Sequence, residues 1–240
     1  MDIEVLGGLR ALENGVPVVP TSQPARQVFA VLAAYADQLV PTTVLAAELS
    51  AHGPDGERAR AMLLTAIRQI RELLAGAADS AGRRTPEAVL VSLPGGFLLD
   101  TDSGRSDQSV FAREAGAGYR AMARGEFATA ARRLRGALRL WRGPAFGGIE
   151  AGPRLAARVA DLEATRLSAL KQWVEAELAL GRHRELRTEL RAVTSAKSLE
   201  TYRTLAEVLG SDLGPCPADT TRALRRALLP GPLPLVPVAA

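Results

Sequence analysis

A chain of 240 residues is long enough for one large core or two modest ones, and its 47% hydrophobic and 23% charged residues are typical of a folded, soluble protein. This composition excludes an intrinsically disordered chain, and no apolar run approaches the roughly 18 residues that a membrane span requires. The formal net charge of +4 comes from 30 basic residues, almost all of them arginine, and 26 acidic ones.

The first and second parts of the chain carry opposite net charges. Residues 1–100 hold 8 arginines against 11 aspartates and glutamates, a net charge of −3, so residues 101–240 carry +7. A net acidic first part argues against nucleic-acid binding there, because phosphate contacts supply much of that affinity. The arginine excess also partly reflects codon supply, since alanine, arginine, leucine and glycine dominate, as in GC-rich genomes.

The sequence favours a cytoplasmic location. Its start, MDIEVLGGLR, has no basic segment followed by an apolar run, so we expect no secretory signal. The single cysteine, Cys216, rules out an internal disulfide bond and is typical of a reducing compartment.

Residues 1–50 predict a small β-sheet followed by two helices. The runs IEVLG, LRAL and VPVVP are short and β-like, and the turn signal ENG separates the last two. From Pro24 the apolar spacing becomes three to four residues, which predicts a helix through ARQVFAVLAAYA. A second short helix fits TTVLAAELS, where Thr42 or Thr43 can cap the first turn.

Residues 51–100 predict one longer helix and a hairpin. The stretch GERARAMLLTAIRQIRELL, residues 56–74, is amphipathic and follows the breaker cluster HGPDG, in which Asp55 is a candidate N-cap. After a polar loop, AVLVSL, PGG and FLLD predict two strands joined by a tight turn. Residues 1–100 thus have the order small sheet, three helices, hairpin.

Residues 101–107, TDSGRSD, have the composition of a linker, and the segments after them have helical spacing. A helix pair is predicted on either side of Gly125, and a long amphipathic helix runs from GPRLAARV to ELALG. The apolar stripe of the long helix contains Leu155, Val159, Leu162, Leu167, Leu170 and Val174. Shorter helices are expected around 183–194, 198–209 and 218–229, and the proline-rich tail 230–240 is expected to be unpacked.

Motifs for catalysis and metal binding are missing from the sequence. There is no HExxH, no GxxxxGK[ST] phosphate loop and no GxGxxG after a strand. The two histidines, His52 and His183, and the one cysteine lack the spacing of a metal site. We therefore predict a protein that is not an enzyme and that holds no cofactor and no metal.

The order of these parts resembles the Streptomyces antibiotic regulatory protein (SARP) family, in which a winged helix-turn-helix precedes a helical bacterial transcriptional activation domain. The most specific stretch is RRLRGALRLWRGPAFGGI, which carries the family's LWRGP at Leu140 to Pro144. The stretch VLGGLRALENGVPV resembles the opening strands, ARQVFAVLAAYADQLVP the first helix, ARAMLLTAIRQIRELL the recognition helix and PGGFLLD the wing. LALGRH and DLGPCPADTTRALRRALL are similar to the later helices.

The resemblance implies a mainly α fold with a small β component. An OmpR-like winged helix-turn-helix would occupy residues 1–100, a linker 101–107, an all-α, tetratricopeptide-like activation domain 108–229, and a proline-rich tail 230–240. Two features depart from the family's pattern. Between LALGRH and SLETYRTLAEVLGSDLG the chain is short by about one helix and a turn, and Leu64 replaces a commonly polar position of the recognition helix.

The helix of residues 56–74 has two faces at 100° per residue. The inward face contains Leu63, Ala66, Ile67, Ile70 and Leu74. The opposite face contains Arg60, Leu64, Arg68 and Arg71, flanked by Thr65 and Gln69. Such a face suits plain solvent exposure, but in a helix-turn-helix it enters the major groove, where arginine contacts guanine or phosphate and leucine a thymine methyl.

The residues that we predict to contact bases or the groove are Arg60, Leu64, Thr65, Arg68 and Arg71, and those predicted to contact phosphates are Arg26, Arg83 and Arg84. Four acidic residues dilute the six arginines from Arg58 to Arg84 to +2. Weak affinity per protomer would then favour two protomers on adjacent half-sites. Trp141 and Trp173 lie in amphipathic patterns and are expected in the core.

The resemblance implies a sequence-specific DNA-binding transcriptional activator of a secondary-metabolite (antibiotic) biosynthetic gene cluster. It would bind promoter repeats in double-stranded DNA and recruit RNA polymerase holoenzyme, without a membrane. The homodimer is a hypothesis that rests on the weak affinity expected of one protomer, not on the resemblance. The +7 of the second part would either follow the DNA backbone or meet an acidic surface of the polymerase. The alternative is a degenerate SARP-like protein that no longer binds DNA and acts as a protein-interaction module, as the acidic first part and the missing helix suggest.

Overall fold

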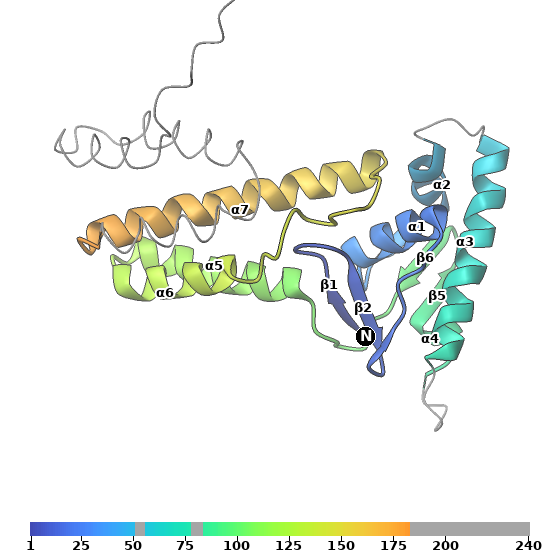
Figure 1. The fold of residues 1–240 in the computed structure, drawn as a ribbon, viewed down its shortest axis with the longest axis horizontal. Helices are drawn as coiled ribbons and strands as arrows, with labels where there is room; N and C mark the ends of the chain where they lie inside the picture. Colours follow the sequence, from blue (N-terminus) through green and yellow to red (C-terminus); the bar gives the residue numbers. More distant parts are fainter. Residues whose placement is uncertain (51–55, 78–83, 183–240) are drawn as a thin grey trace, which may run out of the picture.

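The computed structural model describes residues 1–50, 56–77 and 84–182 and is mainly helical with two small antiparallel sheets. The order along the chain is β1 (Asp2–Glu4), β2 (Arg10–Glu13), β3 (Val16–Pro17), α1 (Gln23–Ala34), β4 (Leu39–Pro41), α2 (Thr42–Ser50), α3 (Gly56–Gly76), α4 (Pro86–Val89), β5 (Leu90–Leu93), β6 (Gly96–Leu99), α5 (Asp107–Ala123), α6 (Phe127–Leu138) and α7 (Pro153–Ala179). We call β1 to β6 the winged half and α5 to α7 the helical half. In Figure 1, α3 lies on the edge of the winged half that is remote from the helical half, whereas one end of α7 reaches α1 and α2.

The first sheet has the strand order β1-β2-β3 and confirms the predicted hairpin. The turn between β2 and β3 consists of Asn14 and Gly15, whose φ angles of 52° and 79° are those of a tight hairpin turn. The Asn14 amide also donates a hydrogen bond of 3.0 Å to the carbonyl of Ala77, just beyond the C-terminal end of α3. The sheet thus satisfies a carbonyl that the helix end leaves without an intrahelical donor.

Helices α1, α2 and α3 pack together as predicted for a helix-turn-helix. Pro24 lies in the first turn of α1, where its missing N–H costs nothing, and the helix is buried along almost its whole length. The predicted inward face of α3 is buried at every position: Leu63, Ala66, Ile67, Ile70 and Leu74. The 3.6-residue period therefore identified the correct face of the helix.

The wing is a three-stranded sheet of order β4-β6-β5, with Gly95 at positive φ in the turn between β5 and β6. Two expectations are corrected here. Ala88 and Val89, predicted as strand, lie in α4, because the Thr85 hydroxyl accepts a hydrogen bond from the Ala88 N–H and caps a helical turn after Pro86. The short strand β4 was not predicted and forms because β6 pairs with it.

Helices α5 and α6 form the predicted antiparallel pair, with Gly125 at φ 72° in the turn between them. Helix α7 covers both, and its predicted stripe is buried at Leu155, Leu162, Leu170 and Val174 and half-buried at Val159 and Leu167. An ion pair of 2.8 Å joins Arg133 of α6 to Glu114 of α5, and the hydrogen bond from Arg133 holds the pKa of Glu114 below its ordinary value. Trp141 and Trp173 are buried, which confirms their prediction as core residues.

The segment predicted as a linker, residues 101–107, has buried ends. Thr101 is bonded to the carboxylate of Asp37 through its backbone N–H (2.8 Å) and its hydroxyl (2.8 and 3.0 Å). Asp107, at the start of α5, accepts hydrogen bonds from the backbone N–H groups of Val5 (2.9 and 3.1 Å) and Leu6 (3.1 Å). Both ends of the segment are therefore fixed to the winged half.

The LWRGP motif lies where the helical half meets the start of the chain. The Arg142 N–H donates to the carbonyl of Leu6 at 2.7 Å, and its guanidinium lies 3.0 Å from the carboxylate of Asp107 and 3.1 Å from that of Glu4. Trp141 packs edge-on against Phe111 with ring centroids 5.5 Å apart. The motif is thus part of the junction between the two halves.

Several predictions concern residues outside the described ranges. These are the candidate cap Asp55, the candidate phosphate contact Arg83, the helices around 183–194, 198–209 and 218–229, the tail 230–240 and the missing interior helix.

Candidate DNA-binding surface

The outward face of α3 is exposed where the sequence predicted it. The Leu64 side chain is 67% exposed and that of Arg68 72%, and Arg60 is exposed one turn earlier on the same face. Arg60 has no ion pair within the described residues. Their helix, α3, lies at the edge of the winged half that is remote from the helical half (Figure 1). We call Arg60, Leu64 and Arg68 the outer face of α3.

Arg68 has one acidic neighbour on its own helix. Its Nε lies 3.7 Å from a carboxylate oxygen of Glu72, four residues later, and both side chains are largely exposed. An exposed pair of this kind contributes little, typically below about 1 kcal/mol, because water and salt screen it. Arg68 can therefore exchange Glu72 for a stronger anionic or base partner at small cost.

Arg71 differs from Arg68 because its guanidinium bonds to the wing. It donates hydrogen bonds to the carbonyl of Leu90 at 3.2 Å and to the hydroxyl of Ser92 at 2.9 Å, and its side chain is half-buried. Its Nε is buried without a hydrogen-bond partner in the described residues. Arg71 thus fixes the wing to α3, a role that its helical spacing could not reveal because β5 is remote in sequence.

The two polar residues beside the outer face are bonded within the protein. The Thr65 hydroxyl donates to the carbonyl of Ala61 one turn earlier, at 3.1 Å. The Gln69 side-chain oxygen accepts a hydrogen bond of 2.6 Å from the hydroxyl of Ser22, just before α1. Thr65 stays exposed, whereas Gln69 joins α3 to the start of α1.

A groove with a volume of about 480 Å³ separates α3 from the wing. Its lining residues are Leu64, Ile67, Arg68, Arg71, Glu72, Ala75, Pro86, Glu87, Ser92 and Phe97. Its lining is mainly apolar and contains two arginines and two glutamates, so the groove is formally neutral. This balance agrees with the dilution of charge that the sequence indicated.

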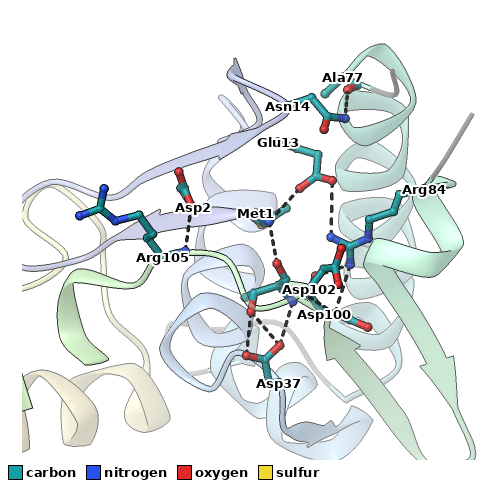
Figure 2. Close-up of polar contacts among 11 residues, drawn as sticks. Met1, Asp2, Glu13, Asn14, Asp37, Ala77, Arg84, Asp100, Asp102 and Arg105 are labelled. Carbon is teal, nitrogen blue, oxygen red and sulfur yellow. Dashed lines mark hydrogen bonds and ion pairs between the residues drawn. The ribbon is translucent and has the colours of Figure 1, made fainter. Parts of the chain in front are cut away.

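The arginines predicted to contact phosphates have different surroundings. Arg26 of α1 is half-buried, and its Nε has no hydrogen-bond partner in the described residues. Arg84, before α4, is only 17% exposed and lies within a cluster of charged groups inside the winged half, which Figure 2 shows.

The guanidinium of Arg84 bonds to groups within the protein. Its guanidinium donates to the carbonyl of Asp100 at 2.7 Å and lies 3.2 Å from the Asp100 carboxylate and 3.5 Å from that of Glu13. Glu13 also lies 3.3 Å from the ammonium group of Met1, which donates to the carbonyl of Thr101. Arg84 therefore points into the protein, and this geometry does not support a phosphate contact.

The described part of the chain offers no metal site and no membrane-spanning helix. There is no group of three or more histidine, cysteine, aspartate or glutamate side chains that could hold a metal ion there. None of the described helices is long and apolar enough to cross a membrane.

Comparison with known proteins places this arrangement among transcriptional regulators. A family model described as bacterial transcriptional activator domain matches residues 106–198. The chain is 36% identical to the regulatory protein DnrI of Streptomyces peucetius, over 95% of this chain and 92% of that protein. It is 29% identical to the transcriptional regulatory protein EmbR of Mycobacterium tuberculosis, again over 95% of this chain but spanning only 63% of EmbR.

A solved structure has the same fold. The structure of M. tuberculosis EmbR in complex with a low affinity phosphopeptide superposes with a TM-score of 0.68 at 28% identity, over 95% of this chain and 64% of that one. The predicted fold, a winged helix-turn-helix followed by a helical activation domain, is therefore confirmed. Together with the identity to DnrI, these findings show that the chain belongs to the Streptomyces antibiotic regulatory protein family of transcriptional regulators.

Proposed function

We propose that this protein is a sequence-specific DNA-binding transcriptional activator that inserts α3 into the major groove. The observation that carries the proposal is the outer face of α3, where Arg60, Leu64 and Arg68 project together. Arginine donors match the acceptor pair of guanine, and an exposed leucine gains by covering a thymine methyl.

The contacts differ in role under this proposal. Arg60, Leu64 and Arg68 meet base edges, while Arg71 holds the wing beside them through Leu90 and Ser92. Thr65 borders the same face and adds a hydroxyl, and the half-buried Arg26 supplies a flanking phosphate contact.

The helical half acts on the transcription machinery in this proposal. It lies on the other side of the winged half from α3 (Figure 1), so it faces away from the duplex that α3 would bind. This arrangement favours a protein partner over the DNA backbone for the positively charged residues of the helical half. We propose RNA polymerase holoenzyme as that partner.

The genes controlled would belong to a secondary-metabolite cluster, by the family to which the chain belongs. Mapping chromosomal occupancy in the producing strain, together with transcripts after deletion of the gene, tests this. We expect bound sites upstream of natural-product assembly genes whose transcripts fall in the deletion strain. Occupancy concentrated at unrelated promoters would contradict it.

Alanine substitution tests the outer face directly. The probe is a duplex selected from a random-sequence pool by the full-length protein. Arg60→Ala and Arg68→Ala should each weaken binding by about 1–3 kcal/mol, since each removes one base contact of the arginine type. Arg132→Ala, which removes an exposed arginine from α6 in the helical half, is the matched control and should leave the affinity unchanged. Unaltered binding in both outer-face variants would refute the assignment.

Two protomers on adjacent half-sites are expected because one protomer presents little net positive charge to DNA. A gel shift on a duplex with two copies of the selected sequence should reach a complex with two protomers. Saturation of this probe by a single protomer would contradict the hypothesis that two protomers bind adjacent half-sites.

The second candidate function is a protein-interaction module without DNA binding, favoured by the neutral groove between α3 and the wing. The dependence of binding on salt separates the two functions. A steep loss of affinity with salt supports the activator, because released counterions report phosphate contacts, and no binding even at low salt supports the module.

A further inference from the structure

The N-terminus of α7 is capped by a residue of the winged half. Gly152, at the N-cap position, has no side chain to accept from the first turn. Instead, one carboxylate oxygen of Glu48 accepts hydrogen bonds from the backbone N–H groups of Arg154 at 2.9 Å and Leu155 at 3.3 Å. Glu48 belongs to α2, the helix that precedes α3 in the helix-turn-helix.

The buried carboxylate of Glu48 depends on these hydrogen bonds to compensate its charge. Its side chain is completely buried, and no arginine or lysine pairs with it in the described part of the chain. A buried carboxylate is costly unless it is hydrogen-bonded and its charge is compensated. The first-turn N–H groups and the positive end of the α7 dipole supply compensation at Oε2, while Oε1 is buried without a hydrogen-bond partner in the described residues.

The two helices approach so closely that position 152 tolerates no side chain. A Cβ atom on Gly152 would lie 2.5 Å from the carbonyl oxygen of Glu48 and 2.7 Å from its carboxyl carbon. Both distances are shorter than any van der Waals contact, and one involves backbone, which cannot rotate away. The absence of a side chain at Gly152 is thus a second feature that permits the cap.

Helix α1 holds the same end of α7. The guanidinium of Arg154 lies over the ring of Tyr35 at 4.4 Å, and that of Arg158 lies 5.8 Å from the same ring. The Gln27 amide donates to the carbonyl of Glu150 at 2.9 Å. The start of α7 is therefore attached to α1 and α2, the two helices on which α3 packs.

We propose that Glu48 is a positioning residue that fixes the activation domain at one orientation relative to α3. The carboxylate ties α7 to the helix-turn-helix, so DNA bound by α3 determines where the helical half lies along the promoter. This inference rests on the proposed function, because it concerns how DNA binding is converted into activation. Loss of the cap leaves the outer face of α3 intact and loosens the α7 end of the junction, while the contacts of Asp107 and Arg142 still join the two halves.

Two variants weaken the cap by independent routes. Glu48→Gln removes the negative charge that the α7 N-terminus compensates and leaves a neutral amide oxygen as the acceptor, while Gly152→Ala keeps the carboxylate and pushes α7 away from α2. The matched control is Glu177→Gln. Glu177 is also buried in α7, at 2% exposure, but its bonds to Trp173, Arg135 and Arg182 stay within the helical region.

The orientation is measured by the distance between two spin labels on the full-length chain. Cysteines replace the exposed residues Thr43 of α2 and Ala164 of α7, and serine replaces Cys216. The DNA probe is the duplex selected by the wild-type protein. Transcription is measured in vitro with a Streptomyces RNA polymerase holoenzyme on a template that carries this duplex upstream of a core promoter.

We expect the wild type and Glu177→Gln to give one narrow distance distribution, and Glu48→Gln and Gly152→Ala to give broad ones. All four proteins should bind the duplex with affinities within about threefold of one another. Transcription should fall on the order of tenfold only in Glu48→Gln and Gly152→Ala, because only a fraction of the molecules then has the helical half correctly oriented.

Three results would overturn the inference. A narrow, unchanged distance distribution in both Glu48→Gln and Gly152→Ala means that Glu48 does not set the orientation. If Glu177→Gln loses as much transcription as Glu48→Gln and Gly152→Ala, the loss reflects lower stability of the protein and not a changed orientation. Unimpaired transcription with broad distances means that orientation does not matter. If the wild type binds no DNA, the proposed function fails, and the label distances alone still decide whether Glu48 fixes the two halves.

Discussion

The arginines of the winged half show how far single residues can be assigned from sequence. Arg60 and Arg68 lie on the exposed face that a period of 100° per residue predicts. Arg71 shares that spacing but bonds to the wing, and Arg84 is enclosed by Glu13 and Asp100. Their partners are remote in the chain, and helical spacing carries no information about such partners.

Arg84 gives a test of structural against DNA-binding roles. We expect Arg84→Ala to lower the free energy of unfolding by about 1–3 kcal/mol, because it removes the guanidinium that pairs with the buried Glu13 and bonds to Asp100, while the Met1 ammonium group still pairs with Glu13. Its affinity for the selected duplex should stay within about twofold of the wild type, since its guanidinium faces inward. Chemical denaturation and a binding titration measure the two effects. If Arg84→Ala lowers the affinity for DNA without changing the stability, the predicted phosphate contact of Arg84 would be supported instead.

Elements were predictable where a pattern repeats within them. Helix α3 and helices α5 to α7 are long enough for apolar spacing to identify them, and Asn14-Gly15 marks a turn by its own chemistry. The short elements β4 and α4 were missed. Strand β4 exists through its pairing with β6, and α4 through a cap from Thr85, so neither has a periodic signal of its own.

The crossing of α5 and α6 depends on a glycine, and this can be measured. A Cβ atom on Gly118 would lie 2.5 and 2.7 Å from two side-chain carbons of Leu134, which is completely buried. We expect Gly118→Ala to destabilise the protein by about 1–3 kcal/mol through overpacking, although alanine favours the helix by about 1 kcal/mol.

The control for this substitution lies one half-turn away on the same helix. A Cβ atom on Gly116 meets only the end of the Arg120 side chain, at 3.5 Å. Gly116→Ala should therefore stabilise the protein by up to about 1 kcal/mol. Thermal unfolding compares the two, and equal shifts of the same sign would show that the close packing at Gly118 is unimportant.

The arrangement of the two halves was beyond what the sequence could predict. The composition of residues 101–107 indicated a linker, yet Thr101 and Asp107 are buried and bonded to the winged half. Glu48 and Gly152 carried no recognisable signal, because a cap supplied by another helix leaves no motif around the glycine that it serves. Only the structure brings the two residues together.

These shared contacts predict that the winged and helical halves unfold together. The chain's two tryptophans, Trp141 and Trp173, both lie in the helical region and report on it alone. We expect their fluorescence transition in denaturant to coincide with the loss of amide protection in α1, as in a two-state protein. The comparison is made under identical conditions on the full-length chain. Separate midpoints would mean that the halves are energetically independent.

The junction has a further property that follows from which groups meet there. At Glu48 the winged half contributes the carboxylate and α7 contributes backbone N–H groups, and at Asp107 the roles are reversed. Backbone donors are present whatever the neighbouring side chains are. Chimeras that join the DNA-binding domain of one relative to the activation domain of another should therefore keep this junction if they retain Glu48, Asp107 and Gly152. The DNA sequence bound and the strength of activation could then be exchanged independently between relatives.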